Sequence, residues 1–162
     1  VEMMERDLGL DLTFSWSRMC DDEGRPLRRR SRRWKGYLSL DQMMADFVIG
    51  NTSSVVLRRS AVERAGLFDE SFQVYYGMDL FLRVAALRER NCRAYEQEVA
   101  YFRSPPSHSR AEWGRLVEKM GHLAPDGAVR MTRRFALSAC KQRAFREAWD
   151  TLKLSFIRFR HK

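Results

Sequence analysis

The chain has few cysteines and no long hydrophobic run. Cys20, Cys92 and Cys140 lie far apart and form no C-x-x-C pair, so neither a disulfide framework nor a zinc site is indicated. No apolar stretch approaches the roughly 18 residues that would cross a bilayer. The N-terminus, VEMMERDLGL, lacks the basic start of a secretory signal. These absences predict a reducing, cytoplasmic setting, at most peripheral at the inner face of the plasma membrane.

Several catalytic motifs are also absent. The sequence contains no glycine-rich phosphate loop and no G-x-S-x-G elbow. Ser104, Ser107 and Ser109 flank His108, but no nearby acid is placed to orient the imidazole. Hydrolase chemistry is therefore not indicated.

The residues that are present suit one globular domain with a strongly uneven charge. The chain has 162 residues, of which 44% are hydrophobic, and a net charge of +9, which is enough material for a core of its own. Basic side chains concentrate in residues 28–35, RRRSRRWK, and in the tail 129–162. Such runs are usually solvated loops and helices. The alternative is an anionic partner, either a membrane surface or nucleic acid, with nucleic acid the less expected.

Local patterns predict an α/β chain. Alternating or β-branched segments predict strands at residues 10–16, 53–57, 92–95 and 99–102. A turn at 96–98 separates the last two strands, and the basic run 28–35 is expected to be a loop. Apolar stripes at helical spacing predict helices at residues 78–87, 110–123, 128–140 and 144–159, the last two as a hairpin.

Two capping boxes mark further helix starts. Ser39 precedes Gln42 by three residues, and Ser60 precedes Glu63 by the same spacing, so each pair can satisfy the free amides of a first turn. Gly66 is expected to end the second of these helices in a left-handed conformation. We expect an α/β unit over residues 1–109 and a helical appendage over residues 110–162.

Three phrases carry a family resemblance. SSVVLRR (53–59), GLFDESF (66–72) and DLFLR (79–83) match in order and spacing the acceptor-side segment of family 2 glycosyltransferases, which this sequence resembles over roughly residues 1 to 110. The resemblance implies the later half of a GT-A fold, a mixed sheet flanked by helices. It also implies transfer of a sugar from a nucleotide-sugar donor to a hydroxyl of a saccharide or lipid-linked acceptor.

The resemblance further implies which residues meet the substrates. Residues 51–53 would lie near the sugar and the donor phosphates, residues 75–79 would lie beside the acceptor, and Arg83 would buttress the helix. The implied substrate-binding residues are Asn51, Thr52, Ser53, Tyr75, Tyr76, Gly77, Arg83 and Arg103.

The sequence departs from the family pattern at the metal motif. The Asp-x-Asp motif, which would hold the Mn²⁺ or Mg²⁺ that neutralises the diphosphate, is absent, as is the nucleotide-binding half before it. The expectation is therefore the later half of a longer enzyme, inactive alone, that associates with itself or with the missing half. His108 is the candidate metal ligand, because the family's histidine position holds Ser104. A solvated loop histidine is the alternative.

The catalytic base also departs from the pattern. Tyr76 and Gly77 occupy the place of an acidic pair whose second member takes the acceptor proton. Asp79 is the candidate replacement. The alternative is a structural aspartate that stabilises the helix dipole by roughly 0.3 to 1 kcal/mol. If the base is lost, the chain is a non-catalytic module that holds an anionic partner through its basic loop and tail.

Overall fold

The sheet is built around one central strand. The computed structural model describes residues 1–30, 33–46, 49, 51–103 and 110–141. Strand β1 (Leu12–Cys20) pairs in parallel with β4 (Cys92–Arg103) along its length. Strands β2 (Pro26–Arg30) and β3 (Val55–Leu57) pair antiparallel with opposite ends of β1. Because a strand has two edges, β2 and β3 share the edge that β4 leaves free. The described chain is α/β with a mixed four-stranded sheet, as the sequence predicts.

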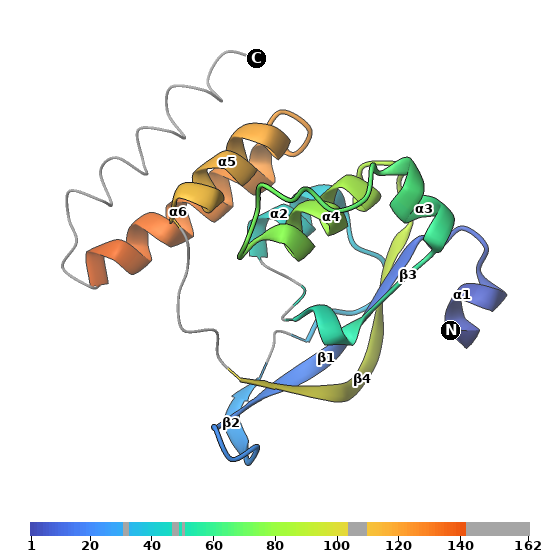
Figure 1. Cartoon of the computed structure of the whole chain (residues 1–162), viewed down its shortest axis with the longest axis horizontal. Helices are drawn as coiled ribbons and strands as arrows, with labels where there is room; N and C mark the ends of the chain where they lie inside the picture. The colour runs from blue at the N-terminus through green and yellow to red at the C-terminus, as the bar shows by residue number, and fades with distance from the viewer. Residues whose placement is uncertain (31–32, 47–48, 50, 104–109, 142–162) are drawn as a thin grey trace.

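Helices cover the sheet unequally. The helical elements are α1 (Glu2–Arg6), α2 (Leu40–Asp46), the 3-10 turn η1 (Thr52–Ser54), α3 (Arg59–Arg64), α4 (Tyr76–Ala85), α5 (Arg110–Met120) and α6 (Pro125–Lys141). Figure 1 shows α2, α4, α5 and α6 gathered together, whereas α1 lies apart from them. No helix among the described residues has the length and apolar character needed to cross a bilayer.

The side chains of β1 alternate between the two faces of the sheet. Leu12 and Phe14 belong to the core that the helices cover. Thr13, Ser15 and Ser17 are buried on the opposite face, as the period of two requires. There α1 supplies part of the cover, since Thr13 Oγ1 contacts Met3 Sδ at 3.6 Å. One face of the strand is therefore apolar and the other carries a row of hydroxyls.

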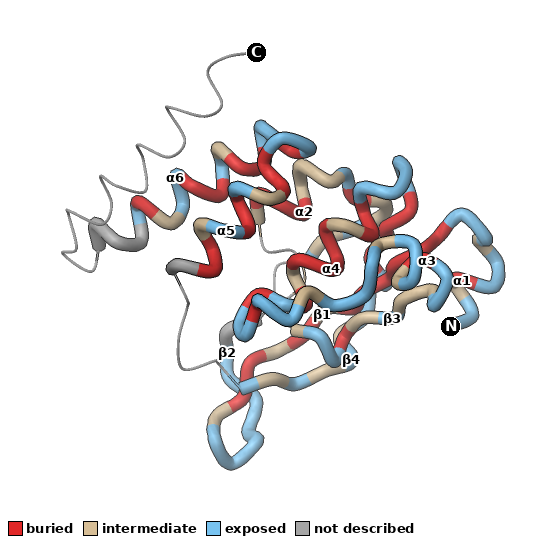
Figure 2. The backbone as a smooth tube through the Cα atoms, turned by 45° about the horizontal axis from the view of Figure 1, so that its top comes forward, coloured by how far each residue is buried: buried red, intermediate tan, exposed pale blue. Residues whose placement is uncertain are grey.

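One core runs across the boundary expected at residue 109. Trp113 and Leu116 of α5 and Met131 of α6 pack in the same buried cluster as Phe14 and Leu80. Figure 2 shows buried stretches on β1 and on α4, α5 and α6. Helix α6 corresponds to the first helix of the predicted hairpin, and residues 144–159 lie outside the described residues. The two-unit division stays a prediction.

Two predictions of secondary structure are wrong. The basic run begins in β2 and not in a loop, because the turn at Asp21–Gly24, with Gly24 at φ +82°, folds it back onto β1. Residues 96–98 do not separate two strands. They stay within β4, because the register against Ser15 and Trp16 shifts there and a bulge absorbs the extra residues.

One capping box is confirmed and the other is wrong. The amide of Gln42 donates to Ser39 Oγ at 3.2 Å, and the amide of Ser39 donates to Gln42 Oε1 at 2.9 Å. Ser60, in contrast, lies inside α3, which begins one residue earlier and has no side-chain cap. Glu63 instead accepts from Arg59 Nε at 2.9 Å, so an ion pair on one helix face takes the place of the cap.

Candidate functional site

Two of the segments expected to bind substrate meet at the start of α4. Gly77 is buried, and a side chain there would place its Cβ 2.7 Å from Thr52 Cγ2. Turn η1 and the first turn of α4 are therefore in direct contact. This approach is possible only because Gly77 has no side chain, since real Cβ atoms do not come so close to a carbon.

Asn51, the residue before Thr52 in the chain, has an unsatisfied side-chain amide. Both Oδ1 and Nδ2 are enclosed, and neither has a hydrogen-bond partner among the described residues. Buried side-chain amides are nearly always bonded to protein or to water. The side chain of Asn51 is thus ready to bond to a polar group supplied from outside the described chain.

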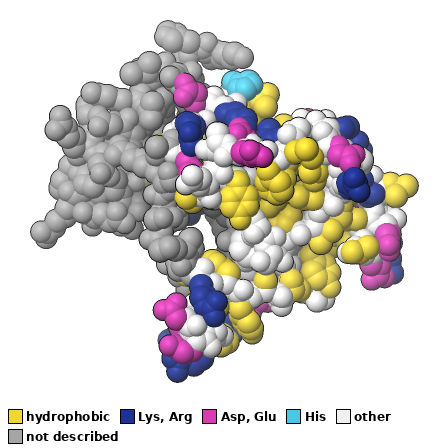
Figure 3. Space-filling model, viewed as in Figure 1, with side chains coloured by type: hydrophobic (Ala, Val, Ile, Leu, Met, Phe, Trp, Pro, Cys, Tyr) yellow, Lys and Arg dark blue, Asp and Glu magenta, His cyan; other side chains and the backbone are white. Residues whose placement is uncertain are grey.

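The aromatic residues before α4 divide between core and surface. Phe72 and Tyr75 are each only 5% exposed, whereas Tyr76 is 40% exposed. The Tyr76 ring lies 5.9 Å from that of Phe68, which is 52% exposed. Figure 3 shows hydrophobic side chains gathered on the surface around α4. Of the predicted aromatics, Tyr76 is the one that offers an open face to a substrate.

Asp79 is enclosed by cations. It has no exposed surface, and its Oδ2 accepts hydrogen bonds from Arg83 Nε at 2.9 Å and Nη2 at 2.6 Å. Lys119 Nζ lies 2.8 Å from Asp79 Oδ1 and 2.7 Å from Asp69 Oδ2. Both carboxylate oxygens of Asp79 are therefore engaged. This arrangement stabilises the packing of α4. The catalytic role of Asp79 stays a prediction, and its carboxylate has no exposed surface that a substrate could reach.

Arg83 ties together two of the phrases that carry the resemblance. Besides Asp79, its guanidinium donates to the carbonyl oxygens of Ala65 and of Leu67, the latter at 2.7 Å. These carbonyls flank Gly66, whose φ of +84° turns the chain out of α3. An arginine on α4 thus holds the exit of α3 in place, which is a buttressing role.

Glu112 is the polar residue of this region that sequence reasoning missed. Its Oε2 accepts the backbone amides of Gln73, Val74 and Tyr75 at 3.1, 2.8 and 3.1 Å. Burial alone would raise the pKa of Glu112, but these three hydrogen bonds outweigh it and hold the pKa below its ordinary value. Burial, together with the charge of Glu112, raises the pKa of Tyr75 to about 12.

Helix α5 presents one polar stripe to the loop before α4. In addition to Glu112, Arg115 Nη2 donates to Ser71 O at 2.9 Å and Lys119 bonds to Asp69. The sequence signal was the spacing of these three residues, which places them on one helix face beside the apolar stripe. The spacing shows the face and does not show the loop that it meets.

Arg103, another predicted site residue, is not brought to this place. Arg103 donates to the carbonyl oxygen of Asp22 at 3.1 Å and pairs with Cys20 in the sheet, whereas Val55, next to η1, pairs with Phe14. Along β1, Cys20 lies six residues beyond Phe14, which is a distance of roughly 20 Å. His108 lies outside the described residues.

The described chain offers no donor set for a divalent metal. Over residues 1–103, apart from the short gaps, and 110–141, no three His, Cys, Asp or Glu side chains come together. Two members of the basic run face carboxylates, since Arg33 and Lys35 lie 4.0 Å from Glu98 and 3.9 Å from Glu96.

The site and the fold define an α/β protein with a small polar and aromatic cluster at the start of one buried helix. Comparison of the chain with protein family models and with curated proteins found no match.

Proposed function

We propose that this chain is the acceptor-side part of a family 2 glycosyltransferase-like protein, and that it binds the acceptor on the surface beside the contact of η1 with α4 without supplying a base of its own. The observation that carries the proposal is the contact of Thr52 with Gly77, together with the unsatisfied amide of Asn51, the residue before Thr52 in the chain. It supports the proposal because residues 51–53 and 75–79 are the two segments that the resemblance assigns to the substrates.

The chemistry of sugar transfer explains the second half of the proposal. An acceptor hydroxyl becomes a good nucleophile when a carboxylate within hydrogen-bond reach takes its proton. Gly77 has no side chain to do so, and the carboxylate of Asp79 is enclosed by Arg83 and Lys119. The acceptor can therefore be positioned here, while its deprotonation depends on a group from outside the described chain or proceeds slowly.

The test uses a longer protein in which a nucleotide-binding half with an Asp-x-Asp motif precedes this chain, either in the reading frame of the source gene or as a co-expressed partner. Release of nucleoside diphosphate is measured with a panel of nucleotide sugars, Mn²⁺ or Mg²⁺, and saccharide or lipid-linked acceptors. We expect donor binding and slow, acceptor-dependent release. A completed protein that binds no donor and releases no diphosphate contradicts the proposal.

The missing base is tested in the same protein. Gly77→Asp is combined with Thr52→Ser, because serine lacks the Cγ2 atom that would lie 2.7 Å from a Cβ at residue 77. A carboxylate at this position should raise the rate about 100-fold over the matched control Thr52→Ser, the usual scale of general base catalysis. If donor binds but neither form transfers sugar, the chain is a non-catalytic binding module.

A further inference from the structure

Strand β4 has two edges, and one of them is open at the end of the strand. The first edge pairs with β1. At the start of the second edge, the amide of Leu38 donates to Cys92 O and the amide of Ala94 donates to Gly36 O, both at 2.9 Å. Farther along, residues 99–103 make no backbone hydrogen bond on this second edge within the part of the chain that the structure describes. We call residues 99–103 the open edge.

The open edge is apolar and lacks the usual protection against pairing. Val99 and Tyr101 are both 58% exposed. Natural sheets protect an exposed edge with lysine, proline or a bulge. The open edge, VAYFR, contains neither lysine nor proline, and its register against β1 is regular from Ala100 onward. An edge of this kind accepts another strand by backbone hydrogen bonding.

The charges along β4 favour an antiparallel strand of the same sequence. Glu96 and Glu98 precede the centre of the open edge, and Arg103 ends it. In a parallel pair of two such strands, acid would lie beside acid and arginine beside arginine, which is destabilising. An antiparallel pair brings Arg103 of each copy to the acidic end of the other. The strand is therefore complementary to a second copy of itself.

The side chains of the open edge favour a twofold axis at Tyr101. Ala100, Tyr101 and Phe102 pair in turn with three successive residues of β1, so their side chains alternate between the faces of the sheet. An axis through Tyr101 places the two Tyr101 rings opposite each other on one face. On the other face, the small Ala100 lies opposite the large Phe102. Aromatic pairs across antiparallel strands are stabilising.

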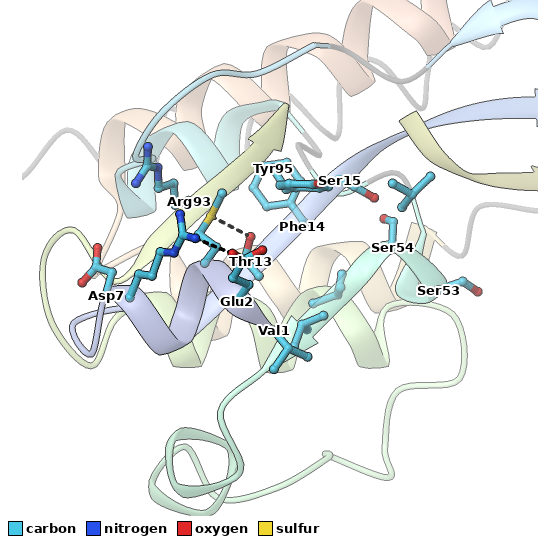
Figure 4. Close-up of a pocket in the computed structure, with 15 residues that line it drawn as sticks. Val1, Glu2, Asp7, Thr13, Phe14, Ser15, Ser53, Ser54, Arg93 and Tyr95 are labelled. Carbon is cyan, nitrogen blue, oxygen red and sulfur yellow. Dashed lines mark hydrogen bonds and ion pairs between the residues drawn. The ribbon is translucent and has the colours of Figure 1, made fainter. Parts of the chain in front are cut away.

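Tyr101 lies beyond the part of β4 that adjoins the proposed acceptor site. Arg93, Tyr95 and Val99 line a pocket together with Ser53 and Ser54 of η1 (Figure 4). Tyr101 does not line that pocket. Pairing centred on Tyr101 is therefore separate from acceptor binding.

We propose that the open edge pairs antiparallel with the open edge of a second copy of this chain, about a twofold axis at Tyr101. The two sheets join into one, in which the order β2-β1-β4 continues as β4-β1-β2 of the second copy. The sequence predicts self-association without indicating a surface, and the open edge supplies one. The inference goes beyond the proposed function and does not rest on it, because pairing needs neither donor nor acceptor.

Sedimentation velocity of the 162-residue chain, from low micromolar to several hundred micromolar, measures the association. We expect a dimer of twice the chain mass of 19.1 kDa, and slower amide exchange at residues 99–103 as the concentration rises. Tyr101→Lys puts like charges opposite each other and should weaken the dimer at least about tenfold. Leu137→Lys is the matched control, because Leu137 is 64% exposed on α6 and the charge change is the same. A chain that stays monomeric, or a dimer that Tyr101→Lys leaves unchanged, overturns the proposal.

Single cysteines then locate the axis, in a Cys140→Ser background where the remaining Cys20 and Cys92 are buried. Directly opposite residues of an antiparallel pair have Cα atoms about 4.5 to 5.5 Å apart, which a disulfide can span. Tyr101→Cys should therefore give a disulfide-linked dimer on mild oxidation. Val99→Cys is the matched control, because it is equally exposed and its two copies would lie about 13 Å apart in this register. Linked dimers that form equally in both variants, or in neither, refute the proposed pairing.

Discussion

Arg83 shows how much a single side chain can hold in this fold. Its guanidinium bonds to the fully buried Asp79 and to two backbone carbonyls at the exit of α3. Arg83→Met should therefore lower the free energy of unfolding by about 3 kcal/mol, because it leaves a buried carboxylate with one cation fewer. Urea denaturation measures the change. Arg59→Met is the control, since that side chain is 93% exposed and its pair with Glu63 contributes at most about 0.5 kcal/mol. Equal losses would show that Arg83 is not a buttress.

Gly77 gives a second prediction for single residues. Glycine inside a helix costs about 1 kcal/mol relative to alanine, so Gly77→Ala would normally stabilise α4. Here the new Cβ meets Thr52 Cγ2, and we expect a net loss of about 1 kcal/mol from overpacking. In a Thr52→Ser background the same substitution should be neutral or stabilising. A double-mutant cycle measures the coupling, and an effect of Gly77→Ala that is the same in both backgrounds would refute the close contact.

At the scale of elements, Glu112 makes the docking of α5 dependent on pH. The folded-state pKa of Glu112 lies below its ordinary value of 4.5. Ionised Glu112 therefore stabilises the fold at pH values above 4.5, and this contribution is lost as pH falls through the folded-state pKa. We expect stability to decline as pH falls below about 5, together with release of the loop at Gln73–Tyr75. Amide exchange of these three residues measures the release directly.

The control for this pH dependence is a neutral side chain at the same place. Glu112→Gln should be less stable than the wild type at pH 7 and should lose less stability on acidification, because no proton is taken up at residue 112. Glu70→Gln, at an exposed acid in the neighbouring loop, should leave the slope unchanged. A slope that Glu112→Gln does not reduce would assign the acid sensitivity to other carboxylates.

The crossing of α2 and α6 depends on a glycine. A Cβ at Gly127 would lie 2.5 Å from the carbonyl oxygen of Asp41 and 2.8 Å from Met44 Cβ, and the Gly127 amide donates to Asp41 Oδ1 at 2.7 Å. Gly127→Ala should therefore cost about 2 kcal/mol or more, since backbone must move. Gly114→Ala is the matched control, because a Cβ at Gly114 would meet nothing within 4 Å among the described residues and alanine there should add about 1 kcal/mol. Thermal unfolding distinguishes the two signs.

Local signals in the sequence were sufficient where the partner of a residue is near in the chain. The Ser39–Gln42 capping box, the left-handed Gly66 and the apolar stripe of α5 all follow from spacing. Tertiary contacts were not predictable in this way. The partners of Glu112 lie nearly forty residues earlier in the chain, and the bulge in β4 depends on its register against β1. Spacing indicates a face, and only the packed fold shows what that face meets.

For the candidate site, the sequence predicted which segments matter better than what each residue does. Residues 51–53 and 75–79 were expected near substrates, and η1 and α4 do meet at Thr52 and Gly77. Asp79 could be read from the sequence as a base or as a structural carboxylate, because spacing does not reveal burial. Its two cationic partners come from the next turn of α4 and from α5. The enclosed hydroxyl of Ser15 has no sequence signal, since alternation predicts its face and not its cover.

At the scale of the whole molecule, the shared core predicts that the helices after residue 109 are required for folding. Trp113, Leu116 and Met131 are almost completely buried, in one cluster with residues of α4 and the sheet. Loss of one such side chain costs about 2 to 5 kcal/mol. Losing all of them would therefore cost about as much as the whole 5 to 15 kcal/mol that stabilises a typical domain. A chain that ends at residue 109 should lose its cooperative thermal transition. One that ends at residue 141 keeps every described contact and should retain it. Circular dichroism on heating compares the two, and a sharp transition in the shorter chain would establish residues 110–162 as a true appendage.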